Sequence, residues 1–96
     1  MNILVELLNT TAQLKVEGRL DTITAPELDK RINELDVKEL VLDLQNLEYI
    51  SSAGLRVLLS THKKFVKLDG MKVINVKAEV MEIFEMTGFA DILNIA

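Results

Sequence analysis

The sequence LVLDLQNLEYISSAGLRV, residues 40–57, contains the transition that decides the fold. Its first five residues, Leu40 to Leu44, form a short apolar run, which is typical of a strand covered on both faces. From Ser52 onward, apolar residues recur every three or four positions as far as Val66, the spacing of an amphipathic helix. The stretch therefore predicts a buried strand followed by a loop of small residues and then a helix.

Two strands and a helix are expected before this stretch. Alternating side chains over residues 3–7 and 14–17 indicate two strands, and the turn-forming residues Asn9, Thr10 and Thr11 between them favour a hairpin. The sequence Thr24-Ala25-Pro26-Glu27 is typical of a helix start. Thr24 is expected to cap this helix, with Glu27 as its partner in a capping box.

Three elements are expected after the second helix. Gly70 is expected to end that helix in the left-handed conformation, and residues 71–76 are expected to form a strand. A third helix follows and should end at Gly88. Residues 92–95 are compatible with a short closing strand or with a tail packed on the sheet.

These elements predict an α/β fold of one domain, residues 1–96, in the order β-β-α-β-α-β-α with a possible final strand. Strands separated by helices imply parallel crossovers, whereas the opening hairpin is antiparallel, so we expect a mixed sheet covered by helices. Loops at the carboxyl ends of strands tend to carry function in such sheets. This directs attention to residues 18–24 and 45–54.

Composition narrows the class of function. Eleven basic and fifteen acidic residues give a formal charge of −4, which disfavours direct binding to nucleic acid. The chain has no cysteine, no signal-like leader and no apolar run of the roughly 20 residues needed to span a membrane. We therefore expect a cytoplasmic protein that does not insert into membranes.

Ser52 lies at the expected start of the second helix, and two interpretations of it stay open. Serine commonly caps a helix by accepting a hydrogen bond from an amide two or three residues on. A free helix N-terminus also favours an anion, so that a phosphate on this serine would be tolerated. The sequence composition does not decide between them.

Catalysis is not expected. His62, the only histidine, lies ten residues after Ser52 on the same expected helix, about 15 Å away, so it cannot activate that hydroxyl. Its position on the apolar face favours a packed or half-buried residue. No metal-ligand cluster and no phosphate-binding glycine loop is present, so neither a metal nor a cofactor is predicted.

Three stretches resemble the STAS family, the anti-sigma factor antagonists of bacteria. Their order and spacing extend over about 90 residues. They are Val16–Asp21 with Thr24–Leu28, Leu42–Leu44 running into Ile50–Leu55, and Asn75-Val76 through Met86–Phe89.

The resemblance implies a partner-switching role. Members bind an anti-sigma factor that is a serine kinase and thereby release a sigma factor; the kinase phosphorylates a serine of the antagonist, and a phosphatase removes the phosphate. Alignment on Gly54-Leu55 places the acceptor at Ser52. The implied partner-binding residues are Asp21, in the loop after the second strand, and the segment Ser51, Ser52, Ala53, Gly54, Leu55 and Arg56.

Two positions depart from the family motif. The aspartate that precedes the acceptor is Ser51 here, and the serine or threonine that follows it is Ala53. Ser51 is therefore an alternative acceptor. The alternative function is a STAS subunit of a larger assembly, such as a lipid-transport ABC system or a stress-signalling complex, in which Ser52 caps a helix and is never phosphorylated.

Overall fold

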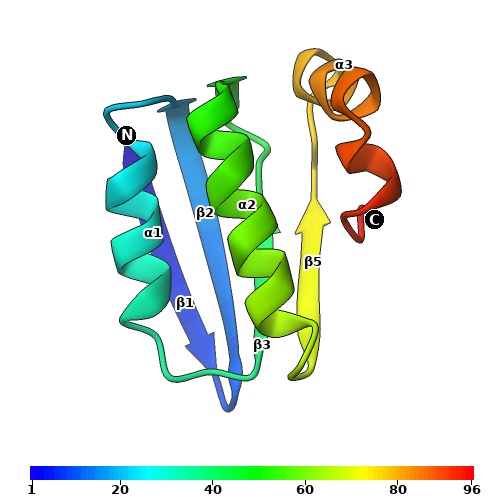
Figure 1. Ribbon diagram of the computed structural model, residues 1–96. Helices are drawn as coiled ribbons and strands as arrows, with labels where there is room; N and C mark the ends of the chain where they lie inside the picture. The colour runs from blue at the N-terminus through cyan, green and yellow to red at the C-terminus, as the bar shows by residue number, and fades with distance from the viewer.

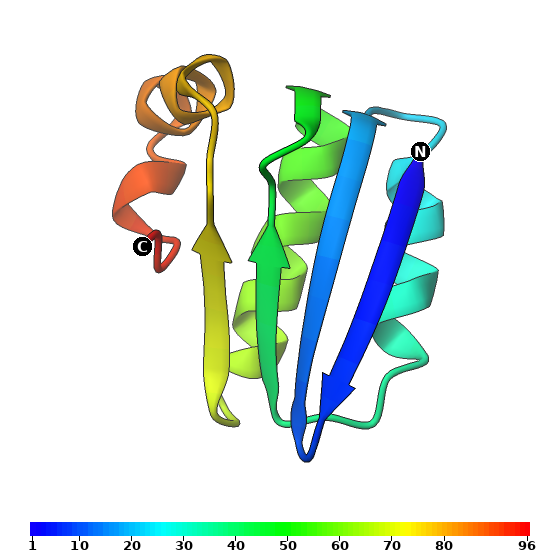
Figure 2. The same cartoon turned by 180° about the vertical axis from the view of Figure 1, so that it is seen from behind.

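A mixed sheet of five strands forms the centre of the computed structural model, which describes residues 1–96 (Figures 1 and 2). Two helices cover one face of the sheet, and a third helix lies beyond its β5 edge. The strands are β1 (Asn2–Leu8), β2 (Thr11–Leu20), β3 (Glu39–Asp43), β4 (Leu47–Ile50) and β5 (Gly70–Ile74). The helices are α1 (Ala25–Asn33), α2 (Ser52–Phe65) and α3 (Ala78–Thr87), followed by a 3₁₀ turn, Phe89–Asp91.

The sheet has the strand order β1-β2-β3-β5, with β4 paired to β2. β1 and β2 are antiparallel, whereas the β2–β3, β2–β4 and β3–β5 pairs are parallel. The predicted hairpin and mixed sheet are confirmed. β4 was not predicted, because it has only four residues and its two buried side chains, Leu47 and Ile50, are too few to show a period.

Gly18 lets one long strand serve two partners. β2 pairs with β3 along Thr11–Lys15 and with β4 along Gly18–Leu20. The register shifts between Gly18 and Arg19, and Gly18 has a φ of +99°, a conformation that glycine adopts without strain. Its amide donates to the carbonyl of Asn46 at 2.9 Å. The last residues of β2 therefore pair with β4 in place of β3.

The helices cover only one face of the sheet. Figure 1 shows α1 and α2 in front of the strands, and Figure 2 shows no helix across β1, β2 or β3 on the reverse side. The prediction that Leu40–Leu44 is covered on both faces is therefore wrong. Leu40 and Leu42 are fully buried, whereas Val41 between them is half-buried.

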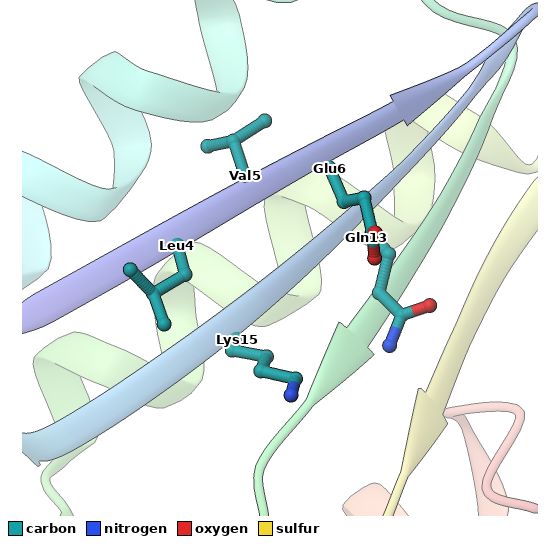
Figure 3. Close-up of a pocket in the computed structure, with 5 residues that line it drawn as sticks. All are labelled: Leu4, Val5, Glu6, Gln13 and Lys15. Carbon is teal, nitrogen blue, oxygen red and sulfur yellow. The ribbon is translucent and has the colours of Figure 1, made fainter.

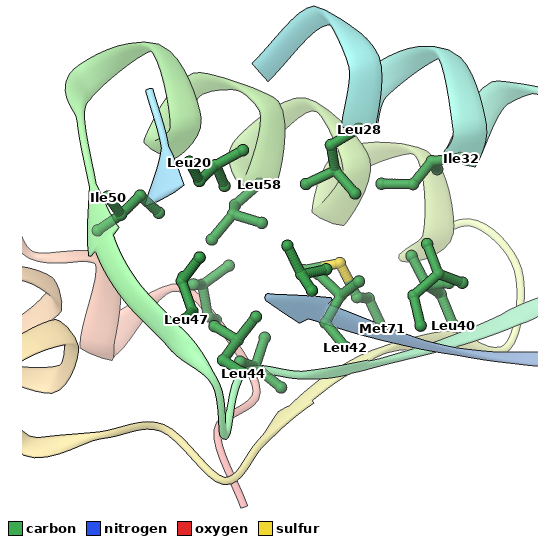
Figure 4. Packing of buried hydrophobic residues seen from close by; sticks show 14 of the residues in the cluster. Leu20, Leu28, Ile32, Leu40, Leu42, Leu44, Leu47, Ile50, Leu58 and Met71 are labelled. Carbon is green, nitrogen blue, oxygen red and sulfur yellow. The ribbon is translucent and has the colours of Figure 1, made fainter. Parts of the chain in front are cut away.

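The hydrophobic core fills the space between the sheet and these two helices (Figure 4). Leu28 and Ile32 of α1 and Leu58 of α2 are almost completely buried against strand residues such as Leu40 and Leu42. Buried residues recur every three or four positions in the helices and every second position in the strands. Both kinds of element could therefore be recognised in the sequence.

One predicted boundary, at Gly70, is wrong, and the ends of α3 and of the chain agree with what the sequence predicted or left open. α2 ends at Phe65, and Gly70, with a φ of +102°, begins β5 and does not end the helix. Gly88 ends α3 in the left-handed conformation, as predicted, with a φ of +82°. The C-terminal residues form a tail beside β5, where the Val73 amide donates to the Asn94 carbonyl at 2.8 Å, and only the isolated bridge between Val73 and Ile95 is strand-like.

Gly54 should be intolerant of any side chain. A Cβ at this position would lie 2.7 Å from Leu20 Cγ and 2.8 Å from Ile50 Cγ1. We expect Gly54→Ala to lower the free energy of unfolding by about 1–3 kcal/mol, because overpacking displaces buried side chains. Helix propensity alone would favour alanine by about 1 kcal/mol.

Urea unfolding midpoints test this expectation, with Ser60→Ala, at an exposed position of the same helix, as the control. The control should match the wild type or exceed it slightly. A Gly54→Ala protein as stable as the control would show that α2 does not depend on this close approach.

Candidate functional site

Two loops that are far apart in the sequence begin side by side. Leu20, the last residue of β2, pairs with Ile50, the last residue of β4, and the amide of Ser51 donates to the carbonyl of Leu20 at 2.9 Å. The loop from Asp21 to Thr24 and the start of α2 therefore leave the same end of the sheet, at the top of Figure 1. This end is where the sequence had placed candidate residues in both loops.

Asp21 organises the first loop. Its Oδ1 accepts hydrogen bonds from the amides of Ile23 at 3.0 Å and Thr24 at 3.1 Å. The Thr24 hydroxyl donates to the carbonyl of Arg19 at 2.7 Å and accepts from the amide of Asp21 at 2.9 Å. Thr24 therefore makes no side-chain cap on α1, and the predicted capping box with Glu27 is wrong. The hydroxyl is used inside the loop and not on the helix.

The same contacts favour the ionised form of the Asp21 carboxyl. The hydrogen bond from the Thr24 amide is the main cause that lowers its pKa from the ordinary value of 3.8. The Ile23 amide, the Thr24 hydroxyl and the Arg19 guanidinium act in the same direction, and partial burial opposes them. The Nε of Arg19 lies 3.9 Å from Asp21 Oδ2.

A cation–π pair lies next to this loop. The guanidinium carbon of Arg19 is 4.2 Å from the centre of the Tyr49 ring, and the two residues are partners in the β2–β4 register. This is close enough for the ring face to attract the cation. Sequence analysis missed the pair, because it depends on β4, whose existence the apolar pattern did not indicate.

The two serines at the start of α2 have different surroundings. Ser51 is the N-cap: its backbone is extended and its hydroxyl accepts from the Gly54 amide at 3.4 Å, a long hydrogen bond. Ser52 is the first helical residue, and its hydroxyl is exposed and makes no hydrogen bond. The interpretation of Ser52 as the capping residue is therefore wrong, and the capping role belongs to Ser51.

The remaining residues of this segment divide by burial. Ala53 is half-buried and Arg56 is exposed, whereas Gly54 and Leu55 are buried. Gly54 and Leu55 were expected on the partner-binding surface. Gly54 instead lies against Leu20 and Ile50, and Leu55 belongs to the hydrophobic core, so burial removes both from an exposed binding surface.

His62 is half-buried on α2, in agreement with the packed position expected for it. Its Nδ1 is buried without a hydrogen-bond partner. No group of three or more histidine, cysteine or acidic side chains is arranged to hold a metal ion. None of the helices is both long and apolar enough to cross a membrane.

A shallow pocket of about 250 Å³ lies elsewhere, on the β1–β2 hairpin. Figure 3 shows Leu4, Glu6, Gln13 and Lys15 around it, all on these two strands. Leu4 is the register partner of Lys15, and Glu6 of Gln13, so the pocket is a gap between neighbouring cross-strand pairs. It does not reach the loops at the end of β2 and β4.

Comparison with known proteins identifies the family. The sequence-family model of the STAS domain matches residues 2–96 of this chain. The chain belongs to the STAS-domain family. A protein of Bordetella bronchiseptica, BtrV, designated a candidate anti-sigma factor antagonist, is 38% identical over 85 residues, which cover 84% of this chain and 73% of that protein.

Solved structures of anti-sigma factor antagonists have the same fold. The crystal structure of an anti-sigma factor antagonist from Mycobacterium paratuberculosis matches 98% of this chain and 83% of its own, at 28% identity and a TM-score of 0.87. The unphosphorylated anti-sigma factor antagonist SpoIIAA of Bacillus matches 99% of this chain and 88% of its own, at 17% identity and a TM-score of 0.81. SpoIIAA is also known in a phosphorylated form.

The charge on Asp21 should stabilise the fold in a pH-dependent way. Because its folded pKa is lowered, the contribution is present above about pH 3.8 and is lost as the pH falls through the lower folded value. We expect wild type to be more stable than Asp21→Asn near pH 7 and this difference to shrink in acid. Chemical unfolding of both proteins across the pH range measures it. A difference that persists unchanged to a pH of about 2 would show that the ionised carboxylate is not its source.

Proposed function

We propose that this chain is an anti-sigma factor antagonist that acts in the cytoplasm by binding an anti-sigma factor serine kinase, which frees a sigma factor. The binding surface comprises the Asp21–Thr24 loop and the exposed start of α2. Phosphorylation of Ser52 ends the interaction, and a serine phosphatase restores it. The observation that carries the proposal is the free, exposed hydroxyl of Ser52 beside the ordered Asp21 loop.

Ser52 is favoured over Ser51 as the acceptor. A kinase needs a hydroxyl that can reach its active site, and Ser52 is exposed and unbonded. Ser51 is half-buried, and its oxygen accepts the Gly54 amide. A phosphate on Ser51 would disturb the cap, whereas one on Ser52 would leave the cap in place.

The start of α2 can accommodate a phosphate. No acidic residue lies in its first turn, so the partial positive charge of the helix N-terminus is not already neutralised. Arg56 is exposed four residues further on, and residues four apart are neighbours on a helix surface, so its guanidinium could pair with a phosphate on Ser52. The fold should therefore persist after modification.

The same phosphate would oppose binding. It adds about −1.5 to −2 charges at neutral pH. With a partner carboxylate about 6 Å away and an effective dielectric constant near 20, the repulsion is roughly 4–6 kcal/mol. Half of that would weaken binding about thirtyfold or more. The switch is therefore electrostatic and leaves the architecture intact.

The departure from the family motif at Ser51 is compatible with this mechanism. Serine and aspartate are both strong N-caps, so the exchange keeps the capping function and removes one negative charge. A phosphate on the neighbouring Ser52 would then have no adjacent carboxylate to repel it.

Ser52 should be the residue that the kinase modifies. Mass spectrometry after incubation with the kinase and ATP should locate phosphate on Ser52, and Ser52→Ala should abolish it. Ser51→Ala should still be phosphorylated, while losing about 0.5–2 kcal/mol of stability with its cap. Phosphate on Ser51 would move the site by one residue. No phosphate on either serine would favour the permanent subunit of a larger assembly.

Phosphorylation should separate binding from folding. We expect phosphorylated protein and Ser52→Asp to bind the kinase at least about thirtyfold more weakly than wild type, for the electrostatic reason above. The free energy of unfolding should change by no more than about 1 kcal/mol. The change should be stabilising, because the added charge lies at a helix N-terminus. Titration calorimetry and thermal melts measure the two quantities. Undiminished affinity of the phosphorylated protein would contradict the mechanism.

A further inference from the structure

Ile23 is the most exposed of the large apolar side chains in the structure. It is 87% exposed, compared with 80% for Met86 on α3. Single exposed apolar residues are common on protein surfaces and need no explanation by themselves. Ile23 differs because it lies within the Asp21–Thr24 loop, which leaves the sheet next to Ser51 and Ser52.

Hydrogen bonds within the loop restrict the backbone at Ile23. Its own amide donates to Asp21 Oδ1 at 3.0 Å, and the next amide, of Thr24, donates to the same atom at 3.1 Å. The Thr24 hydroxyl ties the loop back to the Arg19 carbonyl at 2.7 Å. Isoleucine is also branched at Cβ, which restricts χ1. An apolar side chain is thus presented to solvent with little conformational freedom left to lose on binding.

The surroundings indicate the chemistry of a matching surface. Next to this loop, Arg19 lies over the half-exposed ring of Tyr49 and is itself 61% exposed. Arg56 is exposed on the first turns of α2. The Asp21 carboxylate is already engaged by the loop amides. A complementary partner would therefore offer an apolar pocket for the isoleucine and carboxylates at its rim for the two guanidinium groups.

We infer that Ile23 is the apolar anchor of the complex and inserts into a hydrophobic pocket on the anti-sigma factor kinase. This inference rests on the proposed function. Hot spots of protein interfaces are rigid, largely buried anchors surrounded by polar contacts of low individual value. In this account Asp21 is a positioning residue, because it acts by holding the loop that presents Ile23.

The test compares Ile23→Ala with Met86→Ala, which removes a side chain of similar size and exposure from α3. Each variant and the wild type are titrated against every purified anti-sigma factor serine kinase encoded in the same genome. We expect Ile23→Ala to weaken binding about tenfold to a hundredfold, the loss that removing a buried isoleucine side chain implies. Ile23→Asp should weaken it further, whereas Met86→Ala should bind as wild type does. Thermal melts of all variants should coincide, because neither residue contributes to the core.

The outcomes separate this inference from the proposed function. If Ile23→Ala binds as tightly as wild type while Ser52→Asp does not bind, Ile23 is not the anchor and the proposed switch stands. If Met86→Ala loses affinity equally, the anchor assignment is also overturned, because exposed apolar area and not position would decide binding. If wild type binds none of the kinases, both proposals fail.

Discussion

The end of the sheet at which β2 pairs with β4 is the constraint on which the candidate site depends. The hydrogen bond from the Ser51 amide to the Leu20 carbonyl continues the β2–β4 ladder by one step, and it fixes the two loops next to each other. Gly18 makes this possible by shifting the register so that β2 changes partner. Gly54 then allows α2 to approach Leu20 and Ile50 closely. Two glycines thus place the residues that the proposed function requires.

Capping a helix and accepting a phosphate conflict when one serine does both. In the proposed function, two adjacent serines carry out these roles separately. A capping hydroxyl must point at a backbone amide, whereas a phosphoacceptor must be free to enter a kinase. The Ser51 hydroxyl accepts a hydrogen bond from the Gly54 amide, whereas Ser52 is exposed. Because the cap is made by the residue before the proposed acceptor, phosphorylation there need not unfold the first turn of α2. This separation of roles would allow the proposed switch to change binding without changing the fold.

Much of the fold could be predicted because its elements carry strong local patterns. The hairpin, the apolar face of α2 and the left-handed Gly88 depend on residues near one another in the chain. Coverage of β3 could not be predicted, because an apolar run does not distinguish one covered face from two. Val41 is half-buried although its neighbours are fully buried.

The candidate site was located by the family motif, but its internal contacts were not predictable. The Arg19–Tyr49 pair depends on a four-residue strand with no visible period. Thr24 has the sequence signature of a cap, yet its hydroxyl bonds to Arg19 and Asp21. The Thr24 hydroxyl has several possible hydrogen-bond partners in the loop and at the helix start. Which of them it bonds to depends on the folded geometry. Ile23 has no sequence signature, since its exposure depends on how Asp21 closes the loop.

The most direct test of the central claim is a comparison of two-dimensional ¹H–¹⁵N NMR spectra of the protein before and after phosphorylation, each free and with the kinase added. We predict that phosphorylation shifts only cross-peaks from residues 21–24 and 49–56, and that kinase broadens these peaks in the unmodified protein alone. Shifts spread through β3, β5 and α3, or equal broadening in both forms, would contradict an electrostatic switch on an unchanged fold.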